Sequence, residues 1–296
     1  MAGQQPRFRA VAEFLRRCRK RITPEQAGVS RGRRQRGPGL RREQVAQLAG
    51  ISETWYARLE QGREHGVSVQ VLHSLADALR LELPEREYLL TLTTAHDEAP
   101  SPSEESLASL ARLMRALDDL PSMVVDACWD VLVWSRAASR LFPSLDTLPP
   151  ARRNALWLVF AEPEVGQMAS DWEGQARAMV AQFRLAWARH VEHPRFDELV
   201  ADLSLHSSEF ACWWGEHDVR ARLTRYRVYE HPIVGRLDVE RHVLRILDPA
   251  ELWQVMFVPV PGTESAARLR RLTTDCLAAL GTIVTAISIG LAGQVA

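Results

Sequence analysis

Cysteine and lysine are both scarce in this sequence of 296 residues. The four cysteines, at positions 18, 128, 212 and 276, form no CxxC pair and no metal-ligand spacing with histidine. They are typical of the reduced cysteines of a cytoplasmic protein. The N-terminus is basic with no apolar stretch behind it, so no signal peptide is predicted.

Catalytic signatures are also lacking. There is no nucleophile with its base, no Walker loop, no dinucleotide fingerprint and no paired metal ligands. His206, Ser207, Ser208 and Glu209 bring catalytic residue types together, but adjacent helical positions point in different directions. We therefore predict that the chain is not an enzyme and needs no cofactor or metal.

The formal net charge of zero conceals an asymmetry. Residues 1–42 hold 13 Lys and Arg against 2 Glu, and the rest of the chain holds 24 basic against 35 acidic residues. Such a basic segment indicates a polyanionic partner. All cations except Lys20 are arginines, whose planar fork suits phosphate and guanine. A GC-rich genome would explain the scarcity of lysine, but not the clustering.

The most informative stretch is EQVAQLAGISETWYARLEQGR, residues 43–63. It predicts a helix, a tight turn at Gly50, where a residue without Cβ is favoured, and a second helix capped by Ser52. The alternative is an ordinary αα-hairpin. If the motif binds DNA, the outer face of the second helix enters the major groove and carries Glu53, Thr54 and Arg58.

Helices are expected over residues 8–20, 42–49, 52–61 and 69–79, with a fifth opened by Pro84. Residues 40–92 thus resemble the XRE-type, lambda-repressor-like domain of five helices. On that family's pattern the recognition helix begins at Ser52. Arg42 stands where the family often has Gln, which suggests phosphate contact. Glu53 also departs from the pattern, because an acid near DNA needs cytosine N4 or an arginine partner.

The loop SRGRRQRGPGLRR, residues 30–42, holds six arginines beside the motif. We expect an arm on phosphates or in a narrow minor groove, and the alternative is a solvated basic loop. The predicted DNA-binding residues are Arg33, Arg34, Arg36, Arg41, Arg42, Ser52, Glu53, Thr54, Arg58 and Arg63.

The second half predicts a mixed domain. An amphipathic helix through Met114 follows the linker, and residues 123–126 and 131–134 read as a hairpin. A long helix spans 172–187. Further strands are expected at 225–229, 236–240, 243–247 and 252–258. This order suits one antiparallel sheet with helices packed on it.

The same half resembles the MmyB-like regulators, in which an XRE domain precedes a PAS-like ligand-binding domain. The resemblance covers about residues 8–272. The landmarks that carry it are PSMVVDACWDVLVWSRAASRLF (121–142), RNALWLVF (153–160), DWEGQARAMVAQFR (171–184), LSLHSSEFACWWGEHDV (203–219) and HPIVG (231–235). It implies a fold of α plus α/β type: a helix-turn-helix domain and a sensor domain with an antiparallel sheet and helices.

Most of the nine tryptophans fall in this second half. They would line a pocket for an apolar ligand or simply form a core. A lone histidine is likewise more often structural than a ligand contact, and Asp218 beside His217 would equally serve a salt bridge or a helix cap. The candidates for orienting a ligand are Arg184, Ser208, Trp213, His217 and His231.

Residues 276–296 carry no charge. The 3-4-3-4 spacing of Leu277, Leu280, Val284, Ile287 and Leu291 favours a docking or dimer helix. A membrane tail is the alternative, although glycines and hydroxyl residues dilute the segment.

The sequence thus predicts a helix-turn-helix domain (1–96), a linker (97–106), a PAS-like ligand-binding domain (107–275) and a C-terminal helix (276–296). We expect a cytoplasmic, homodimeric transcription regulator that binds operator DNA and responds to an apolar or amphipathic small molecule, with a fatty-acid-like effector as one candidate. The alternatives are a second domain that only dimerises or binds a protein, and an enzyme with a DNA-binding appendage.

Overall fold

The computed structural model describes residues 4–31, 37–63, 66–93, 101–191, 193–221, 224–248 and 250–274. Their contacts divide the chain into two compact units. The first comprises residues 1–98, 177–204 and 210–222, and the second comprises 99–176, 205–209 and 223–296. Helices from the second half of the sequence therefore belong to the same unit as the first 98 residues. The predicted domain boundaries stay a prediction.

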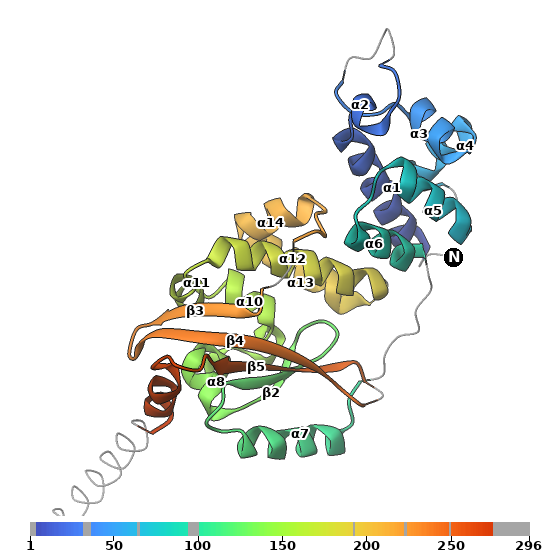
Figure 1. Cartoon of the computed structure of the whole chain (residues 1–296). Helices are drawn as coiled ribbons and strands as arrows, with labels where there is room; N and C mark the ends of the chain where they lie inside the picture. The colour runs from blue at the N-terminus through green and yellow to red at the C-terminus, as the bar shows by residue number, and fades with distance from the viewer. Residues whose placement is uncertain are drawn as a thin grey trace, which may run out of the picture. The chain divides into compact units, whose positions relative to one another are not determined.

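The described part of residues 1–98 is made of helices joined by short connections (Figure 1). The helices are α1 (Gln4–Arg21), α2 (Pro24–Ala27), α3 (Arg42–Ala49), α4 (Glu53–Leu59), α5 (Val69–Ala78) and α6 (Leu83–Thr93). This all-helical fold, with α3 and α4 at the positions of the motif, confirms the predicted helix-turn-helix fold. The structure adds α2 to the five predicted helices, and α1 begins earlier than the predicted residue 8.

One apolar face of α1 supplies the centre of this unit. Val11, Phe14 and Leu15 are at most 1% exposed, as their helical spacing predicts. The Phe14 ring packs edge-on against Tyr88 of α6, with centroids 5.0 Å apart. The same buried cluster contains Val45 of α3 and Leu59 of α4, so the helix-turn-helix is fixed on α1.

Three further helices follow in the second half: α12 (Trp172–Arg189), α13 (Pro194–His206) and α14 (Ser208–Gly215). The long helix predicted over 172–187 is α12. Ala188, Val191 and Val219 belong to the same buried cluster as α1 and are at most 1% exposed.

The second unit is mixed. Its helices are α7 (Glu104–Ala116), α8 (Arg136–Leu141), α9 (Ser144–Thr147), the 3-10 turn η1 (Pro150–Arg152), α10 (Ala155–Phe160) and α11 (Pro163–Met168). Its strands are β1 (Ser122–Val125), β2 (Val131–Trp134), β3 (Tyr226–His231), β4 (Gly235–Ile246) and β5 (Leu252–Pro259). A last helix occupies residues 265–274. Helix α7 begins at Glu104, two residues before the predicted end of the linker.

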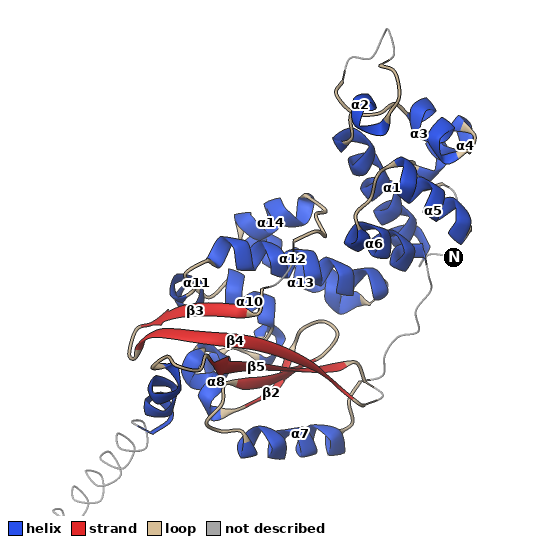
Figure 2. Cartoon of the chain, viewed as in Figure 1, coloured by secondary structure: helices blue, strands red, loops and turns tan. Residues whose placement is uncertain are grey.

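The five strands form one antiparallel sheet in the order β2-β1-β5-β4-β3 (Figure 2). This confirms the predicted hairpin and the antiparallel, PAS-like sheet. The prediction of two strands at 236–240 and 243–247 is wrong, because β4 runs unbroken through them. Arg241 and His242, which lie between the two predicted strands, stay in register with Phe257 and Met256 of β5.

Helices pack on both faces of the sheet. Leu110 and Met114 of α7 cluster with Val124 and Leu252 on one face. On the other face Phe142, the residue after α8, packs against Tyr229 of β3 and Phe257 of β5. We call this second face the aromatic face.

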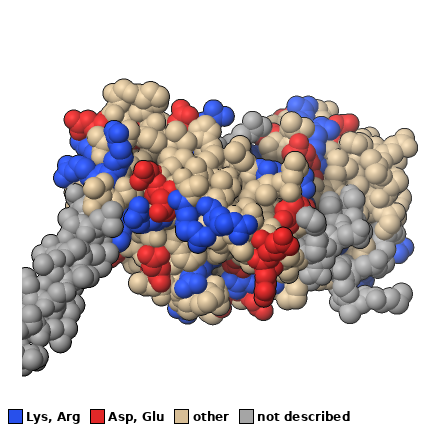
Figure 3. Space-filling view, turned by 90° about the horizontal axis from the view of Figure 1, so that it is seen from below, with Lys and Arg blue, Asp and Glu red and all other residues tan. Residues whose placement is uncertain are grey.

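No helix within the described ranges has the length and apolar character to cross a membrane. The uncharged segment 276–296 lies outside the described residues, so its predicted role as a dimer or docking helix stays a prediction. On the face drawn in Figure 3, basic and acidic side chains are intermingled, in keeping with a net charge of zero.

Candidate nucleic-acid interface and sensor residues

Helix α4 presents the side chains predicted to read DNA. Its N-terminus is capped as expected, because the Ser52 hydroxyl accepts a hydrogen bond of 3.1 Å from the Trp55 backbone N–H. Glu53, Thr54 and Arg58 are all exposed. Tyr56, on the opposite side, is fully buried. The helix therefore offers one polar face outward from a fixed base.

The turn before α4 requires its glycine. Gly50 has φ of 68°, a left-handed conformation that is unfavourable for residues with a Cβ. Its backbone N–H bonds to the Gln47 carbonyl at 3.3 Å, and the Ile51 N–H bonds to the Ala46 carbonyl at 3.0 Å. These bonds close the end of α3 and set the entry of α4.

A buried carboxylate joins the helices of the motif. Glu60, which follows α4, is 2% exposed and accepts hydrogen bonds from Arg19 of α1 at 2.5 and 3.1 Å. Arg42, at the start of α3, adds a third bond of 2.7 Å. Burial acts to raise the pKa of Glu60, but the hydrogen bonds from these arginines outweigh it and hold the pKa below its usual range.

The predicted phosphate contacts are placed unequally. Arg42 is the partner of Glu60, and Arg41 forms an ion pair of 3.1 Å with Glu43. Arg63 is exposed. Arg33, Arg34 and Arg36 lie outside the described residues. The DNA contacts of all these arginines stay predictions, and the structure gives Arg42 a second role in the motif.

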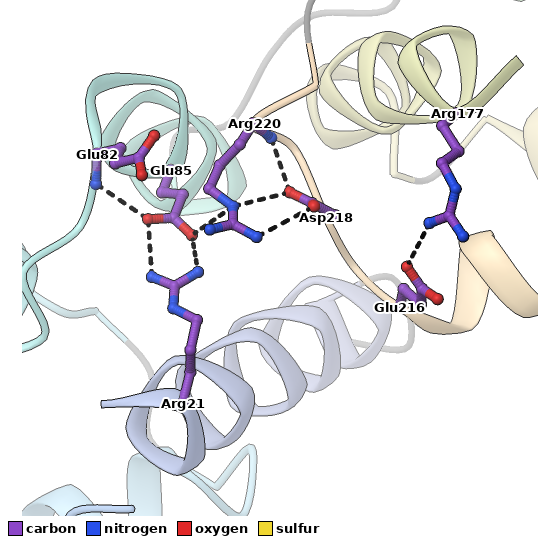
Figure 4. Close-up of polar contacts among 7 residues, drawn as sticks. All are labelled: Arg21, Glu82, Glu85, Arg177, Glu216, Asp218 and Arg220. Carbon is purple, nitrogen blue, oxygen red and sulfur yellow. Dashed lines mark hydrogen bonds and ion pairs between the residues drawn. The ribbon is translucent and has the colours of Figure 1, made fainter. Parts of the chain in front are cut away.

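A second group of ion pairs joins α1 and α6 to the segment after α14, within the same compact unit (Figure 4). Glu85 of α6 accepts bonds of 2.5 and 3.0 Å from Arg21. The Arg220 guanidinium lies 4.0 Å from Glu85 and forms a tighter pair with Asp218 at 3.1 Å. The salt-bridge alternative considered for Asp218 is therefore the one observed.

Two predicted ligand residues, Arg184 and His217, come together in this unit. Arg184 is 1% exposed; its guanidinium stacks 3.8 Å from the Trp214 ring centroid and donates to the Trp214 carbonyl. It also lies 3.0 Å from Nδ1 of His217. Burial and the charge of Arg184 lower the pKa of His217 to about 3. These contacts use the two terminal nitrogens of Arg184, while its buried Nε has no hydrogen-bond partner among the described residues. The role of both side chains in ligand binding stays a prediction.

The other three candidates are dispersed. Trp213 stacks with Arg177 at 4.6 Å, and the Ser208 hydroxyl donates to Glu209 at the start of α14. His231 ends β3, is 3% exposed, and its Nε2 lies 3.1 Å from the Arg140 carbonyl. The structure thus brings Arg184 and His217 together, whereas Trp213, Ser208 and His231 have the contacts given above.

Sequence reasoning missed Glu60, Arg227 and Arg241. Glu60 lies at the end of the second helix of the motif, where an acidic residue is expected to be exposed to solvent. Arg227 of β3 is a buried charged residue between the exposed Tyr226 and the partly buried Val228, and Arg241 of β4 is partly buried. The alternation along β3 was a signal of an inward orientation that the strand prediction did not use. No group of histidine, cysteine or acidic residues in the described ranges could hold a metal ion.

Comparison with known families assigns both halves. Residues 107–272 match the MmyB-like transcription regulator ligand binding domain, and residues 10–89 match a helix-turn-helix domain. A comparison with curated proteins found no relative. The chain belongs to the family of MmyB-like regulators, as its sequence motifs predicted. It is a transcription regulator with a helix-turn-helix DNA-binding domain, and the matched families are not families of enzymes.

Proposed function

We propose that this chain is a cytoplasmic, sequence-specific DNA-binding regulator whose operator affinity changes when its second domain binds an apolar or amphipathic effector. The observation that carries the DNA part is the exposed face of α4, with Glu53, Thr54 and Arg58 beside a segment of strong positive charge. The match to a ligand-binding family supports the effector. Within the described residues no disulfide is present, which supports a reducing compartment.

We propose further that the regulator acts as a homodimer on a two-fold operator. Helix-turn-helix dimers bind half-sites about 10 base pairs, or a multiple of that, apart. Sites selected from random DNA by the full-length chain should therefore contain paired, inverted half-sites. A single unpaired half-site, with a monomer in solution, would contradict this part of the proposal.

Base reading by α4 is tested in the same selection. Arg58→Ala should relax the consensus, because a lost bidentate contact to guanine removes about 1–3 kcal/mol of discrimination. Glu87→Ala, a change at an exposed position of α6, serves as the control and should return the parent consensus. An unchanged consensus for Arg58→Ala would remove that residue from base readout.

The effector part needs its own measurement. Native mass spectrometry of the full-length chain purified from cells should show a bound small molecule. Operator affinity should then differ between the loaded and the stripped protein, because effector and DNA sites are linked. Equal affinities would favour a second domain that serves dimerisation or a protein partner.

A further inference from the structure

The sheet has an open edge along the second half of β4. Strand β3 pairs with β4 only as far as Tyr226 opposite Glu240, whereas β5 accompanies β4 to Ile246 opposite Leu252. Figure 2 shows β4 running on past β3. Within the described part of the chain, residues 241–246 therefore have a neighbouring strand on one side only.

The chain that enters β3 does not prolong the pairing with β4. The Arg241 N–H donates to the Arg225 carbonyl at 2.7 Å, and Arg225 itself lies in a bend. The side chain of Arg227 stands off the sheet on the same face as Tyr229, because alternate residues of a strand share a face. This side chain donates to the Thr224 carbonyl at 2.6 Å, so Thr224 lies out of the plane of the sheet. No described strand covers the edge of β4 beyond Arg241.

This edge offers regularly spaced backbone groups. The N–H and C=O of one residue point to the same side of an antiparallel strand, and the side alternates along the chain. Since the Arg241 N–H points toward β3, the N–H and C=O of Val243 and Arg245 point to the same side, where no described strand pairs with them. A row of such groups is a template for another strand.

Apolar side chains are exposed along the same edge. Val243, Leu244 and Leu247 are 43%, 52% and 100% exposed, and they are three of the ten large apolar residues exposed in the described part of the chain. Lysine and proline, which usually protect an edge from pairing, are absent from residues 242–246, and the register of β4 against β5 is unbroken. Clustered apolar side chains on an unprotected edge indicate an interaction surface.

The positions of the charges favour a second copy of β4 as the partner strand. In one antiparallel register Leu244 lies opposite the partner's Leu244, and Val243 lies opposite the partner's Arg245. A shift of two residues in one direction places Arg245 opposite the partner's Arg245, and a shift in the other direction places Arg241 opposite it. Like charges directly opposite each other are destabilising, so the first register is selected and pairs residues 242–246 with themselves.

We propose that the homodimer of this regulator forms through the open edge of β4, by two-fold antiparallel pairing of residues 242–246 with the same residues of a second copy. This inference rests on the homodimer part of the proposed function and deepens it by naming the surface. Leu244 lies on the two-fold axis, and the backbone groups of Val243 and Arg245 pair across it. The contact is isologous, which is the symmetry that a two-fold operator requires.

Sedimentation of the full-length chain tests this surface. Leu244→Glu places two carboxylates opposite each other on the axis, and it should raise the dimer dissociation constant about a hundredfold or more. Val243→Pro should have a similar effect, because it removes an N–H that only the partner strand would use. Leu205→Glu, at a position 82% exposed outside the edge, is the matched control and should sediment like the parent. Circular dichroism should show the same fold in all four proteins.

A cysteine on the axis tests the register directly. Residues opposite each other in a non-hydrogen-bonded pair have Cβ atoms about 4.5–5.5 Å apart, close to the separation in a disulfide. In a chain carrying Cys212→Ser and Cys276→Ser, mild oxidation should therefore convert Leu244→Cys into a covalent dimer. Leu247→Cys is more exposed but does not lie opposite itself in this register, so it should be linked far more slowly.

The outcomes distinguish this surface from the proposed function. A monomeric parent would overturn both the homodimer and the edge contact, and would leave the edge to a strand of another protein. A dimer that survives Leu244→Glu and Val243→Pro would overturn the edge contact alone. If Leu280→Glu then dissociates that dimer, the interface lies in the apolar C-terminal segment. If Leu244→Glu is monomeric but binds the same paired half-sites with unchanged affinity, the edge contact stands and the proposed two-fold reading of DNA fails.

Discussion

At the scale of single residues, Glu60 links three helices through its bonds to Arg19 and Arg42. Replacing the carboxylate leaves hydrogen-bond donors of Arg19 and Arg42 without their charged acceptor, and because both side chains retain some contact with water, the typical cost is about 1–3 kcal/mol. We therefore expect Glu60→Gln to lower the free energy of unfolding by about that amount, measured by urea denaturation.

The exposed pair of Arg41 and Glu43 provides the matched control for Glu60. Glu43→Gln removes the same chemical group from the same motif, and a surface pair is worth at most about 1 kcal/mol. Equal losses in the two variants would mean that the Glu60 network does not hold the motif together.

His217 gives the protein a defined response to pH. Its pKa falls from 6.5 to about 3 through burial and the charges of Arg184, Arg17 and Arg16, although Glu13 lies 3.6 Å away. Below pH 6.5 the imidazole of His217 is protonated in the unfolded chain but stays neutral in the folded chain. The contribution of His217 to the free energy of unfolding is therefore fully present above pH 6.5 and is lost as the pH falls toward 3.

His217→Asn should remove this loss, because asparagine does not titrate and tolerates the left-handed φ of 51° found here. Between about pH 7 and pH 5 the parent should lose roughly 1–2 kcal/mol more unfolding free energy than the variant. His73→Asn, at an exposed position of α5, should keep the slope of the parent. Parallel pH profiles for the parent and His217→Asn would refute the assignment.

At the scale of elements, the basic loop is anchored where it joins α3. The Leu40 N–H bonds to the carbonyls of Arg19 and Ile22, both at 3.0 Å, and Arg19 donates to the Leu40 carbonyl at 2.8 Å. Gly39 permits this approach. A Cβ at Gly39 would lie 2.5 Å from the Lys20 carbonyl oxygen, so the backbone would have to move.

Gly39→Ala should therefore destabilise the protein by about 1–3 kcal/mol, the usual cost of overpacking, and should weaken operator binding by displacing the loop. Gly37→Ala is the control, since a Cβ there meets no atom of the described residues within 4 Å. Melting temperature and DNA affinity report the two effects. Identical behaviour of the two variants would show that the close approach at Gly39 does not hold the loop.

The elements that sequence predicts best are those with local signals. Gly50 and Ser52 mark the turn and the cap of the motif by residue type alone. The same logic applied to Thr23 and Gln26 would have found α2, where both bonds of a capping box are present. A search for apolar periodicity misses α2, because four residues are too short to show a period.

Contacts between distant residues are what the sequence could not supply. Two separate strands were predicted on either side of Arg241 and His242, yet backbone pairing with β5 continues β4 through both residues. Arg184 was predicted as one of the polar residues that could orient a ligand in the aromatic-rich domain. Its stacking on Trp214 depends on how α12 and α14 pack, and no local pattern encodes that.

At the scale of the whole molecule, the surplus of 11 positive charges in residues 1–42 should make DNA binding steeply dependent on salt. Each phosphate neutralised adds about 0.9 to the slope of log affinity against log salt concentration. Replacing Arg33, Arg34 and Arg36 together with alanine should flatten this slope.

The control for this charge change removes three exposed arginines of the second unit, in the variant Arg112→Ala, Arg115→Ala, Arg270→Ala. It lowers the net charge equally and should leave the slope near that of the parent. A slope unaffected by the first triple replacement would mean that the loop is not an arm on DNA.

The buried cluster that unites α1 with Ala188, Val191 and Val219 bears on how such a regulator evolves. Cutting the chain at the linker would remove apolar residues that cover the DNA-binding helices, and the buried side chains of those helices would become exposed to water. A chimera that joins residues 1–96 to an unrelated sensor domain would therefore expose an apolar patch. Including α12 and the segment after α14 in the chimera would keep that patch covered. The unit that must be kept together is larger than the helix-turn-helix motif and discontinuous in sequence. New DNA or effector specificities should therefore arise by substitutions within the chain more readily than by exchange of its two halves.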